Sequence, residues 1–207
     1  SLDSKLAFEE LAAQSKKITG VWFEEEYIRN YPFGSLASHV IGYTVGGDIG
    51  TWGIEQYYND ELIGTNGREY GYYDSELNLT KVSKPATDGN TVISTLDVNV
   101  QRGVEEKIKE FLAAWKCENI GVIVMNPNNG AIYAMASNAG FDLNEPRDLS
   151  AYYSEEEIAA MSEEDTLKAL NRMWRNFCIS DTYEPGSTFK PFTVAAALEE
   201  NLVKAAD

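Results

Sequence analysis

The chain contains little cysteine and almost no histidine, and these two scarcities exclude several kinds of site. Its two cysteines, Cys117 and Cys178, are too few for a disulfide framework, and their spacing is unlike that of metal ligands. We expect both to pack as small buried residues, and whether they pair is left open. The single histidine, His39, excludes a Cys/His metal cluster. Because it stands in the apolar stretch 38–42, we expect a structural role for it rather than a place in a Ser-His-Asp triad.

The chain is also poor in basic residues. It has 17 Lys and Arg against 33 Asp and Glu, which gives a net charge of −16 at pH 7. Nucleic-acid binding needs clustered cations that neutralise phosphates, and attraction to an anionic membrane surface needs them too. We therefore expect no nucleic-acid partner, and we interpret the acidic balance as a source of solubility.

Long apolar runs are absent. The sequence has no stretch of eighteen apolar residues, so no membrane-spanning helix is predicted, and its first residues lack the pattern of a signal peptide. They fall instead in the middle of a helical pattern, and we therefore expect the chain to be a piece of a longer protein. No pattern in it predicts a cofactor or a metal ion.

The remaining sequence divides into two regions that differ in composition and hydrophobic pattern. Residues 3–17 have helical spacing, and Gly20 marks the stop of that helix. Residues 21–84 are rich in aromatics and glycine, and their short apolar pieces are broken by turns, which predicts an irregular, mostly extended region with small helical pieces. The β-branched segment 91–96 predicts a strand after the turn at 88–90.

The pattern of the second region predicts a sheet covered by helices. Apolar residues recur at helical spacing from Val100 to Trp115, which predicts a long amphipathic helix. Residues 121–125 and 131–136 are apolar runs joined by Asn-Pro-Asn-Asn-Gly, a sequence typical of a tight turn, and they predict a β-hairpin. Helix and hairpin together indicate an α+β fold with an antiparallel sheet.

An acidic, polar insert follows between residues 141 and 175. Ser154 with Glu157, and Ser162 with Asp165, match the spacing of capping boxes and predict two short helices. Their acidic residues lie in first turns, where the helix dipole favours negative charge. We expect this insert to be a solvated helical excursion with no catalytic carboxylate.

The segment 183–190 reads Tyr-Glu-Pro-Gly-Ser-Thr-Phe-Lys and carries the strongest chemical signal. A serine hydroxyl needs a nearby base to become a nucleophile, and Lys190 lies three residues after Ser187, on the same face of a helix. Pro191 is tolerated only near a helix start, which places that start at about Ser187. At that position a helix stabilises developing negative charge, and Phe189 and Phe192 are expected to provide apolar cover for Lys190.

Several further segments give these two residues a context, and together they cover nearly the whole chain. In order, they are Arg-Asn-Tyr-Pro-Phe-Gly at 29–34, Ser-His-Val-Ile-Gly-Tyr at 38–43, Gly-Ile-Glu-Gln-Tyr-Tyr at 53–58, Leu-Ile-Gly-Thr-Asn-Gly at 62–67, Thr-Leu-Asp at 95–97 with Gln101, Val-Met-Asn-Pro-Asn-Asn-Gly at 124–130, Met-Ala-Ser at 135–137, Phe-Asp-Leu-Asn at 141–144 and Asn-Arg at 171–172. In these segments and in Ser187-Thr188-Phe189-Lys190 the chain resembles the class B penicillin-binding proteins, the D,D-transpeptidases that cross-link bacterial peptidoglycan.

The resemblance implies a fold and a mechanism. Residues 1–88 would form an irregular, extended, non-catalytic pedestal or dimerisation-type module, and residues 89–207 the first part of a helix-covered antiparallel-sheet transpeptidase domain. Ser187 would attack the bond between the two terminal D-alanines of a peptidoglycan stem peptide, with Lys190 taking its proton, and the Ser187 N–H would supply half of an oxyanion hole. Penicillins and other β-lactams would acylate the same serine, and no cofactor is implied.

The family's other two motifs, Ser-x-Asn and Lys-Thr-Gly, do not occur in these 207 residues. We therefore expect a truncated fragment, incomplete at the C-terminus and without transpeptidase activity of its own. The parent protein is expected at the extracytoplasmic face of the bacterial membrane, with its membrane anchor absent from this chain.

Two other interpretations stay open. The fragment could serve as a non-catalytic pedestal that binds cell-wall synthesis proteins through its aromatic N-terminal module. Ser-Thr-Phe-Lys also occurs in class D β-lactamases and related penicillin sensors, but these lack an equivalent of the segments 29–34 and 53–58.

Overall fold

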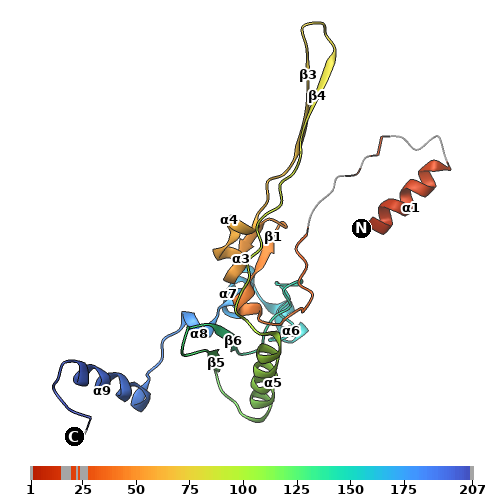
Figure 1. Ribbon diagram of the computed structural model, residues 1–207. Coiled ribbons are helices and arrows are strands. Elements are labelled where there is room, and N and C mark those ends of the chain that lie inside the picture. The colour runs from red at the N-terminus through yellow and green to blue at the C-terminus, as the bar shows by residue number, and fades with distance from the viewer. Residues whose placement is uncertain (1, 15–19, 22, 24–27, 206–207) are drawn as a thin grey trace. The chain divides into compact units, whose positions relative to one another are not determined.

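The protein is described by a computed structural model that covers residues 2–14, 20–21, 23 and 28–205 (Figure 1). The chain divides into two compact units, and each unit takes in separate stretches of sequence. Unit 1 consists of Ser1–Gly34, Ile41–Ile93 and Asp142–Pro146, and unit 2 consists of Ser35–Val40, Ser94–Phe141 and Arg147–Asp207.

The described residues of unit 1 form short helices and two small antiparallel hairpins. Its elements are α1 (Leu2–Ala13), β1 (Tyr43–Val45), β2 (Ile49–Thr51), α3 (Gly53–Tyr57), α4 (Asn59–Leu62), β3 (Arg68–Tyr73) and β4 (Leu79–Lys84). The helix predicted at 3–17 ends at Ala13, and residues 15–19 lie outside the described part. The prediction of short helical and extended pieces in this region is confirmed.

The turn before β1 requires a glycine. Gly42 has a φ of +75°, and a Cβ at this position would lie 1.9 Å from the Trp52 carbonyl oxygen. An L side chain would therefore be strained and would also collide with the backbone at Trp52, which leads into α3. Gly42 thus allows the backbone just before β1 to approach the start of α3.

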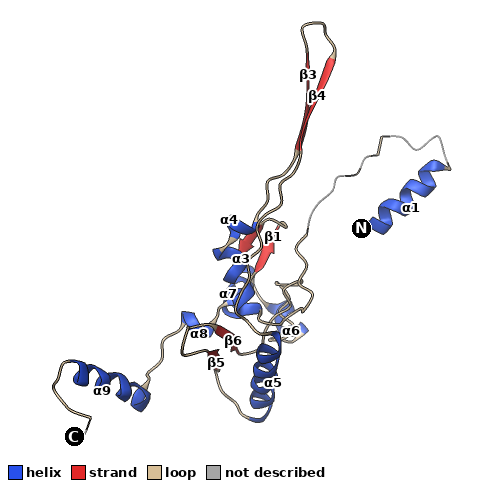
Figure 2. Ribbon diagram, in the orientation of Figure 1, coloured by secondary structure: helices blue, strands red, loops and turns tan. Residues whose placement is uncertain are grey.

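Unit 2 contains one long helix, one hairpin and a series of shorter helices. Its elements are α5 (Val98–Ala114), β5 (Gly121–Met125), β6 (Ile132–Ser137), α6 (Glu155–Ala160), α7 (Glu163–Trp174), α8 (Phe177–Ser180), η1 (Gly186–Phe189) and α9 (Lys190–Glu199). Helix α2 (Ser38–Ile41) begins in this unit. Figure 2 shows the mixture of helices and two-stranded antiparallel sheets, which confirms the predicted α+β class.

The predicted helix and hairpin of unit 2 are both present. Asp97 caps α5, because its carboxylate accepts hydrogen bonds from the N–H groups of Asn99 and Val100. Strands β5 and β6 pair antiparallel from Gly121↔Ser137 to Met125↔Ile132. The Asn126 side chain accepts a bond from the Asn128 N–H at 2.9 Å, which shapes the turn that joins them.

The strand predicted at 91–96 is wrong, because no residue of this segment is in a strand. Thr95 instead uses its side chain to join the start of β6. Its hydroxyl donates to the Ile132 carbonyl at 2.8 Å and accepts from the Ile132 N–H at 3.1 Å. The hydroxyl replaces the backbone groups that a strand would use, so β-branched composition alone misidentified the segment.

Gln101 completes the edge of β6 in the same manner, and it is nearly fully buried on α5. Its Nε2 donates to the Met135 carbonyl at 3.0 Å, and its Oε1 accepts from the Met135 N–H at 2.9 Å. A single amide thus satisfies both backbone groups of a buried strand residue. The side chain fixes α5 against β6 by the pattern of bonds that a neighbouring strand would make.

Replacing Gln101 with leucine should lower the free energy of unfolding of unit 2 by about 2–4 kcal/mol, because two buried backbone groups lose their partners. Hydrogen-exchange mass spectrometry of peptides from β6 measures this directly. Arg102→Leu, on the exposed side of the same helix, is the matched control and should change stability by less than about 0.5 kcal/mol. Equal protection of β6 in the two variants would contradict the prediction.

The acidic insert is only partly as expected. Ser154 and Glu157 form a complete capping box at α6, and the Ser162 hydroxyl accepts from the Asp165 N–H at the start of α7. The expectation of a solvated excursion is wrong, however, since α7 buries Ala169, Leu170, Met173 and Trp174. These four residues lie on one face of the helix, and only its first turns are acidic.

The cysteines also differ from expectation. Both are free thiols; Cys117 is exposed and Cys178 is half-buried. The Cys178 Sγ lies 3.4 Å from the Ala136 carbonyl oxygen, and burial raises the pKa of this thiol. Neither cysteine is therefore the fully buried core residue that its residue type indicated.

Candidate active site

Ser187 and Lys190 lie in consecutive elements near the end of unit 2. Ser187 belongs to the short 3-10 helix η1, and Lys190 is the first residue of α9. The Lys190 N–H donates to the Ser187 carbonyl, so the two residues are closed into one helical turn. Gly186, with a φ of +55°, provides the left-handed turn that leads into it. Pro191 occupies the first turn of α9, as the sequence predicts.

The surroundings of this turn are open. The side chains of Ser187 and Lys190 are both exposed. The rings of Phe189 and Phe192 stack with centroids 5.5 Å apart, but they too are exposed. Phe189 and Phe192 therefore do not provide the apolar cover that was expected for Lys190.

The segment ahead of the turn is held by two residues that the sequence did not reveal. Asn176 is buried, and its side-chain carbonyl caps α8 by accepting from the Cys178 N–H at 3.0 Å. Arg175 forms an ion pair with Asp181, with 3.0 Å between its Nε and the carboxylate. Of the pair predicted at 171–172, Asn171 bonds the Leu167 carbonyl within α7, and Arg172 lies 4.0 Å from Glu118.

His39 is a structural residue, as its context predicts. Its Nε2 lies 2.9 Å from the Met173 carbonyl oxygen, and its ring packs edge-on against Phe141 with centroids 5.5 Å apart. Burial lowers the pKa of this imidazole, although the hydrogen bond to Met173 acts in the opposite direction. The neutral ring is thus the form that the fold stabilises.

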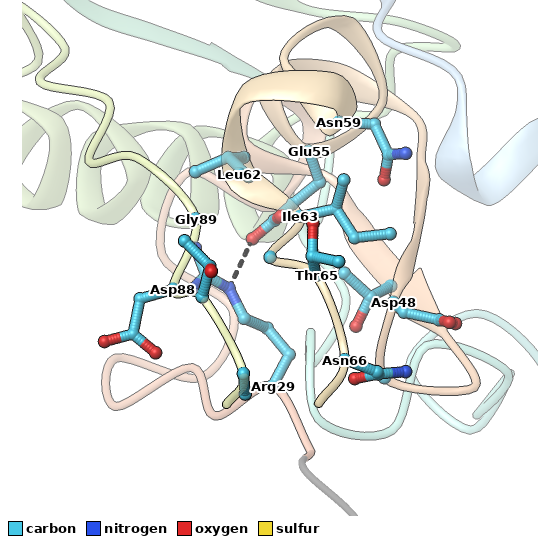
Figure 3. Close-up of a pocket in the computed structure, with 15 residues that line it drawn as sticks. Arg29, Asp48, Glu55, Asn59, Leu62, Ile63, Thr65, Asn66, Asp88 and Gly89 are labelled. Atoms are coloured by element: carbon cyan, nitrogen blue, oxygen red, sulfur yellow. Dashed lines mark hydrogen bonds and ion pairs between the residues drawn. The ribbon is translucent and has the colours of Figure 1, made fainter. Parts of the chain in front are cut away.

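Unit 1 contains a cavity of about 250 Å³ (Figure 3) whose wall includes an ion pair. The Arg29 Nε donates to a Glu55 carboxylate oxygen at 2.7 Å. The Glu55 side chain is only 4% exposed, whereas that of Arg29 is 48% exposed. The pair therefore joins the segment 29–34 to α3, and it neutralises a buried carboxylate with a half-buried guanidinium.

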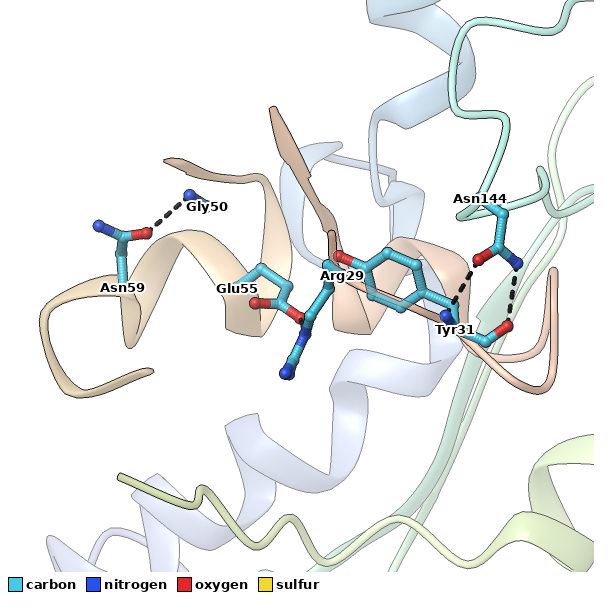
Figure 4. A network of polar contacts seen from close by, with 6 residues as sticks. All are labelled: Arg29, Tyr31, Gly50, Glu55, Asn59 and Asn144. Atoms are coloured by element: carbon cyan, nitrogen blue, oxygen red, sulfur yellow. Dashed lines mark hydrogen bonds and ion pairs between the residues drawn. The ribbon is translucent and has the colours of Figure 1, made fainter. Parts of the chain in front are cut away.

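A second polar connection starts two residues further along. The Tyr31 N–H donates to the Asn144 side-chain carbonyl at 3.0 Å, and the Asn144 amide donates back to the Tyr31 carbonyl at 2.9 Å (Figure 4). Burial raises the pKa of the Tyr31 phenol, and the negative charge of Glu55 adds to this effect. The segments 29–34 and 53–58 and residues 142–144, which the sequence analysis singled out separately, therefore meet within unit 1.

Sequence reasoning missed Arg175 and Asn176, and it singled out the other supporting residues only as members of motif segments, without their contacts. A signal existed for Gln101, since it lies seven residues before buried Ile108 and hence on the buried face of α5. No comparable periodicity marks Asn144 or Asn176. Among the described residues, no group of His, Cys, Asp and Glu side chains could hold a metal ion, and none of the helices has the length and apolar character to cross a bilayer.

Comparison with known proteins gives consistent matches over both units. The model of the penicillin-binding protein transpeptidase domain matches residues 120–207, and that of the penicillin-binding protein dimerisation domain matches residues 3–94. Stage V sporulation protein D of Bacillus subtilis is 35% identical over 190 residues, which are 90% of this chain and 26% of that protein. The probable peptidoglycan D,D-transpeptidase PenA of Neisseria gonorrhoeae is 29% identical over 203 residues, 96% of this chain and 31% of the relative.

A solved structure agrees with these relatives. Penicillin-binding protein 2X of Streptococcus thermophilus matches with a TM-score of 0.63 and 26% identity, over 94% of this chain and 28% of its own. The chain therefore spans between a quarter and a third of the length of the proteins that it matches. The two family models match successive parts of the chain, and together they cover most of the residues. The chain belongs to the class B penicillin-binding proteins.

Proposed function

We propose that the parent protein is a serine-type D,D-transpeptidase of peptidoglycan synthesis, with Ser187 as nucleophile and Lys190 as base. The observation that carries this proposal is the closed turn at the start of α9, in which the Lys190 N–H bonds the Ser187 carbonyl. Residues three apart in such a turn project from the same side. The match of the transpeptidase domain model to residues 120–207 supports the same assignment.

The proposed reaction proceeds in two steps. Lys190 Nζ accepts the Ser187 hydroxyl proton while the oxygen attacks the carbonyl between the last two D-alanines of a stem peptide. The carbon–nitrogen bond breaks, and D-alanine leaves with a proton on its amine. The amine of a neighbouring stem peptide then attacks the serine ester, and the serine oxygen regains its proton. The Ser187 N–H, at the start of a helix, is placed to stabilise the oxyanion in both steps.

The 207-residue polypeptide by itself is proposed to lack this activity. Ser187 and Lys190 are exposed to water, so neither the base nor the oxyanion has the low-dielectric surroundings that such chemistry needs. The Ser-x-Asn and Lys-Thr-Gly motifs of the family are also not among these residues.

A chimera tests both parts of the proposal. Residues 1–207 replace the segment that they match in Stage V sporulation protein D, so that the rest of that relative completes the domain. Fluorescent penicillin should label the folded chimera and should leave the 207-residue chain unlabelled. Stoichiometric labelling of the short chain would contradict the proposed inactivity. A folded chimera that stays unlabelled, beside a labelled relative, would contradict the assignment of the reaction.

A second candidate function concerns unit 1. Exposed tyrosines on the β3–β4 hairpin favour a role in protein contacts at the extracytoplasmic face of the membrane, where the relatives' cell-wall chemistry takes place. Peptidoglycan stem peptides and β-lactams would then be partners of unit 2 only, and other cell-wall synthesis proteins would be partners of unit 1.

A further inference from the structure

The chain contains two Asn-Gly pairs, Asn66-Gly67 and Asn129-Gly130, and the structure holds them in different ways. An asparagine before glycine can react with its own backbone, because the glycine nitrogen is close to the side-chain amide carbon and no side chain hinders its approach. The attack closes a five-membered succinimide ring, which water opens to aspartate or isoaspartate. The contacts of each pair decide whether the two atoms can meet.

The pair Asn129-Gly130 is held against this reaction in the turn between β5 and β6. The Gly130 N–H donates to the Asn126 carbonyl at 2.8 Å, and the Asn129 side-chain carbonyl accepts from the Ala131 N–H at 3.0 Å. The attacking nitrogen and the amide that it would attack each have a hydrogen-bond partner. Reaction here requires that both bonds break, and each bond adds to the barrier.

The pair Asn66-Gly67 lacks such restraints. It lies just before β3, and both of its residues are exposed. Within the part of the chain that the structure describes, no hydrogen bond involves the Gly67 N–H or the Asn66 side chain. Asn66 also borders the cavity of unit 1, which is open to water (Figure 3). The nitrogen and the amide are therefore free to rotate toward each other.

Close packing explains why residue 67 is a glycine. A Cβ at this position would lie 2.7 Å from the Ala86 nitrogen and 2.9 Å from the Lys84 carbonyl oxygen. Any other residue would thus collide with the backbone of the opposite strand. The missing side chain that lets the two strands approach also leaves the Gly67 nitrogen open to the Asn66 amide.

We propose that Asn66 is a site of spontaneous deamidation in the folded protein, whereas Asn129 is protected. Hydroxide removes the Gly67 amide proton, and the nitrogen attacks Asn66 Cγ. The bond from Cγ to Nδ2 breaks, and ammonia leaves with a proton from water. Water then adds to one of the two ring carbonyls, the ring opens, and the Gly67 nitrogen regains a proton. The reaction consumes one water and releases one ammonia, and it needs no oxidant or reductant.

The isoaspartate product changes the main chain. Its peptide bond runs through the side-chain carbon, so the backbone between residues 65 and 68 becomes one carbon longer. This stretch lies between two fixed pairs: Thr65 and Thr87 exchange hydrogen bonds at 2.8 and 2.9 Å, and Arg68 pairs with Lys84. The opposite strand keeps its length. The extra carbon therefore disturbs the pairing at the start of the β3–β4 hairpin.

Both products also add a negative charge to the wall of the cavity. The described residues that line it include the carboxylates of Asp48, Glu55 and Asp88 against the single guanidinium of Arg29. A further carboxylate at residue 66 makes this surface more negative. Deamidation thus changes charge and main-chain length at one place.

Peptide mapping by mass spectrometry tests the proposal on the 207-residue chain at mildly alkaline pH. In the folded chain, Asn66 should convert at least about tenfold faster than Asn129, where two hydrogen bonds must break first. In denaturant the two rates should agree within a factor of about three, because neither amide then has a fixed partner. Equal rates in the folded chain would overturn the proposal. A tenfold preference that persists in denaturant would do so too, because local sequence would then set the difference.

A variant tests the ring mechanism. Asn66→Gln keeps the amide but would have to close a larger ring, so conversion at residue 66 should fall below detection while Asn129 is unchanged. The wild-type product at residue 66 should contain isoaspartate as well as aspartate, since water can open the ring on either side. Aspartate alone would exclude attack by the Gly67 nitrogen and overturn the proposal.

Hydrogen exchange tests the effect on the hairpin. The matched control is Asn66→Asp, which has the charge of the product and a main chain of normal length. The amides of Thr65 and Thr87 should exchange about threefold faster or more in the purified isoaspartate form than in Asn66→Asp, because the mutual bonds are disturbed. Equal exchange in the two proteins would overturn the proposed disturbance of pairing.

Discussion

Ser187→Ala in the chimera should abolish acylation by penicillin. Loss of a serine nucleophile lowers catalysis by roughly a millionfold in enzymes of this kind, because no other group can form the ester. Lys190→Ala should slow acylation by about 10²–10⁴-fold, the usual contribution of a general base. Lys190→Arg should be as slow, because a guanidinium stays protonated at any pH that a protein tolerates and cannot accept the proton. Stopped-flow measurement with a fluorescent penicillin gives these rates.

A neighbouring substitution provides the control. Thr193 is exposed on α9, and Thr193→Ala should leave the acylation rate within a factor of two or so of the parent chimera, as expected for a surface change that touches no reacting group. Retained acylation in Ser187→Ala would show that another residue is the nucleophile. A Lys190→Arg variant as fast as the parent would remove Lys190 from the role of base.

Arg29→Met should destabilise unit 1 by about 3 kcal/mol. The substitution keeps an apolar stem but leaves the carboxylate of Glu55 buried without its partner, and an unpaired buried charge is costly. The half-exposed position of Arg29 places the expected value at the lower end of the range for broken buried pairs. Hydrogen-exchange mass spectrometry of peptides from α3 reports this loss without interference from unit 2.

The double variant Arg29→Met/Glu55→Gln separates the charge from the packing. It should be more stable than Arg29→Met alone, because the unpaired negative charge is gone. Arg68→Met, on the exposed β3–β4 hairpin, is the control. It should change the stability of α3 measured by hydrogen exchange by less than about 0.5 kcal/mol. If Arg29→Met were as stable as the double variant, the ion pair would contribute little to stability.

Elements whose residues follow a strong local pattern were predictable from the sequence. The long helix α5 has apolar residues at regular spacing, the β5–β6 hairpin has a turn sequence with few alternatives, and the caps of α6 and α7 have the expected serines. The position of Ser187 and Lys190 at a helix start followed from Pro185, Gly186 and Pro191. All of these signals lie within a single helix, turn or helix start, where local propensity and capping decide structure.

Features that depend on distant partners were not predictable. Thr95 is β-branched, as strand residues often are. Only its contact with Ile132 explains why the segment 91–96 is not a strand. Gln101 and Asn144 bond backbone groups far along the chain, and no local pattern specifies such a partner. The burial of α7 was missed because its acidic first turn dominates its composition. In each case tertiary contacts overrode local preference.

The discontinuous make-up of the two units has a consequence for synthesis on the ribosome. Unit 1 is translated first, but it includes Asp142–Pro146, and Asn144 supplies both partners of the Tyr31 backbone. Residues 35–40 belong to unit 2 and have few partners until the chain from Ser94 onward emerges. The N-terminal unit can therefore reach its final structure only after much of the following unit has left the exit tunnel. The order of completion does not follow the order of synthesis, and no single cleavage could release either unit with all of its residues.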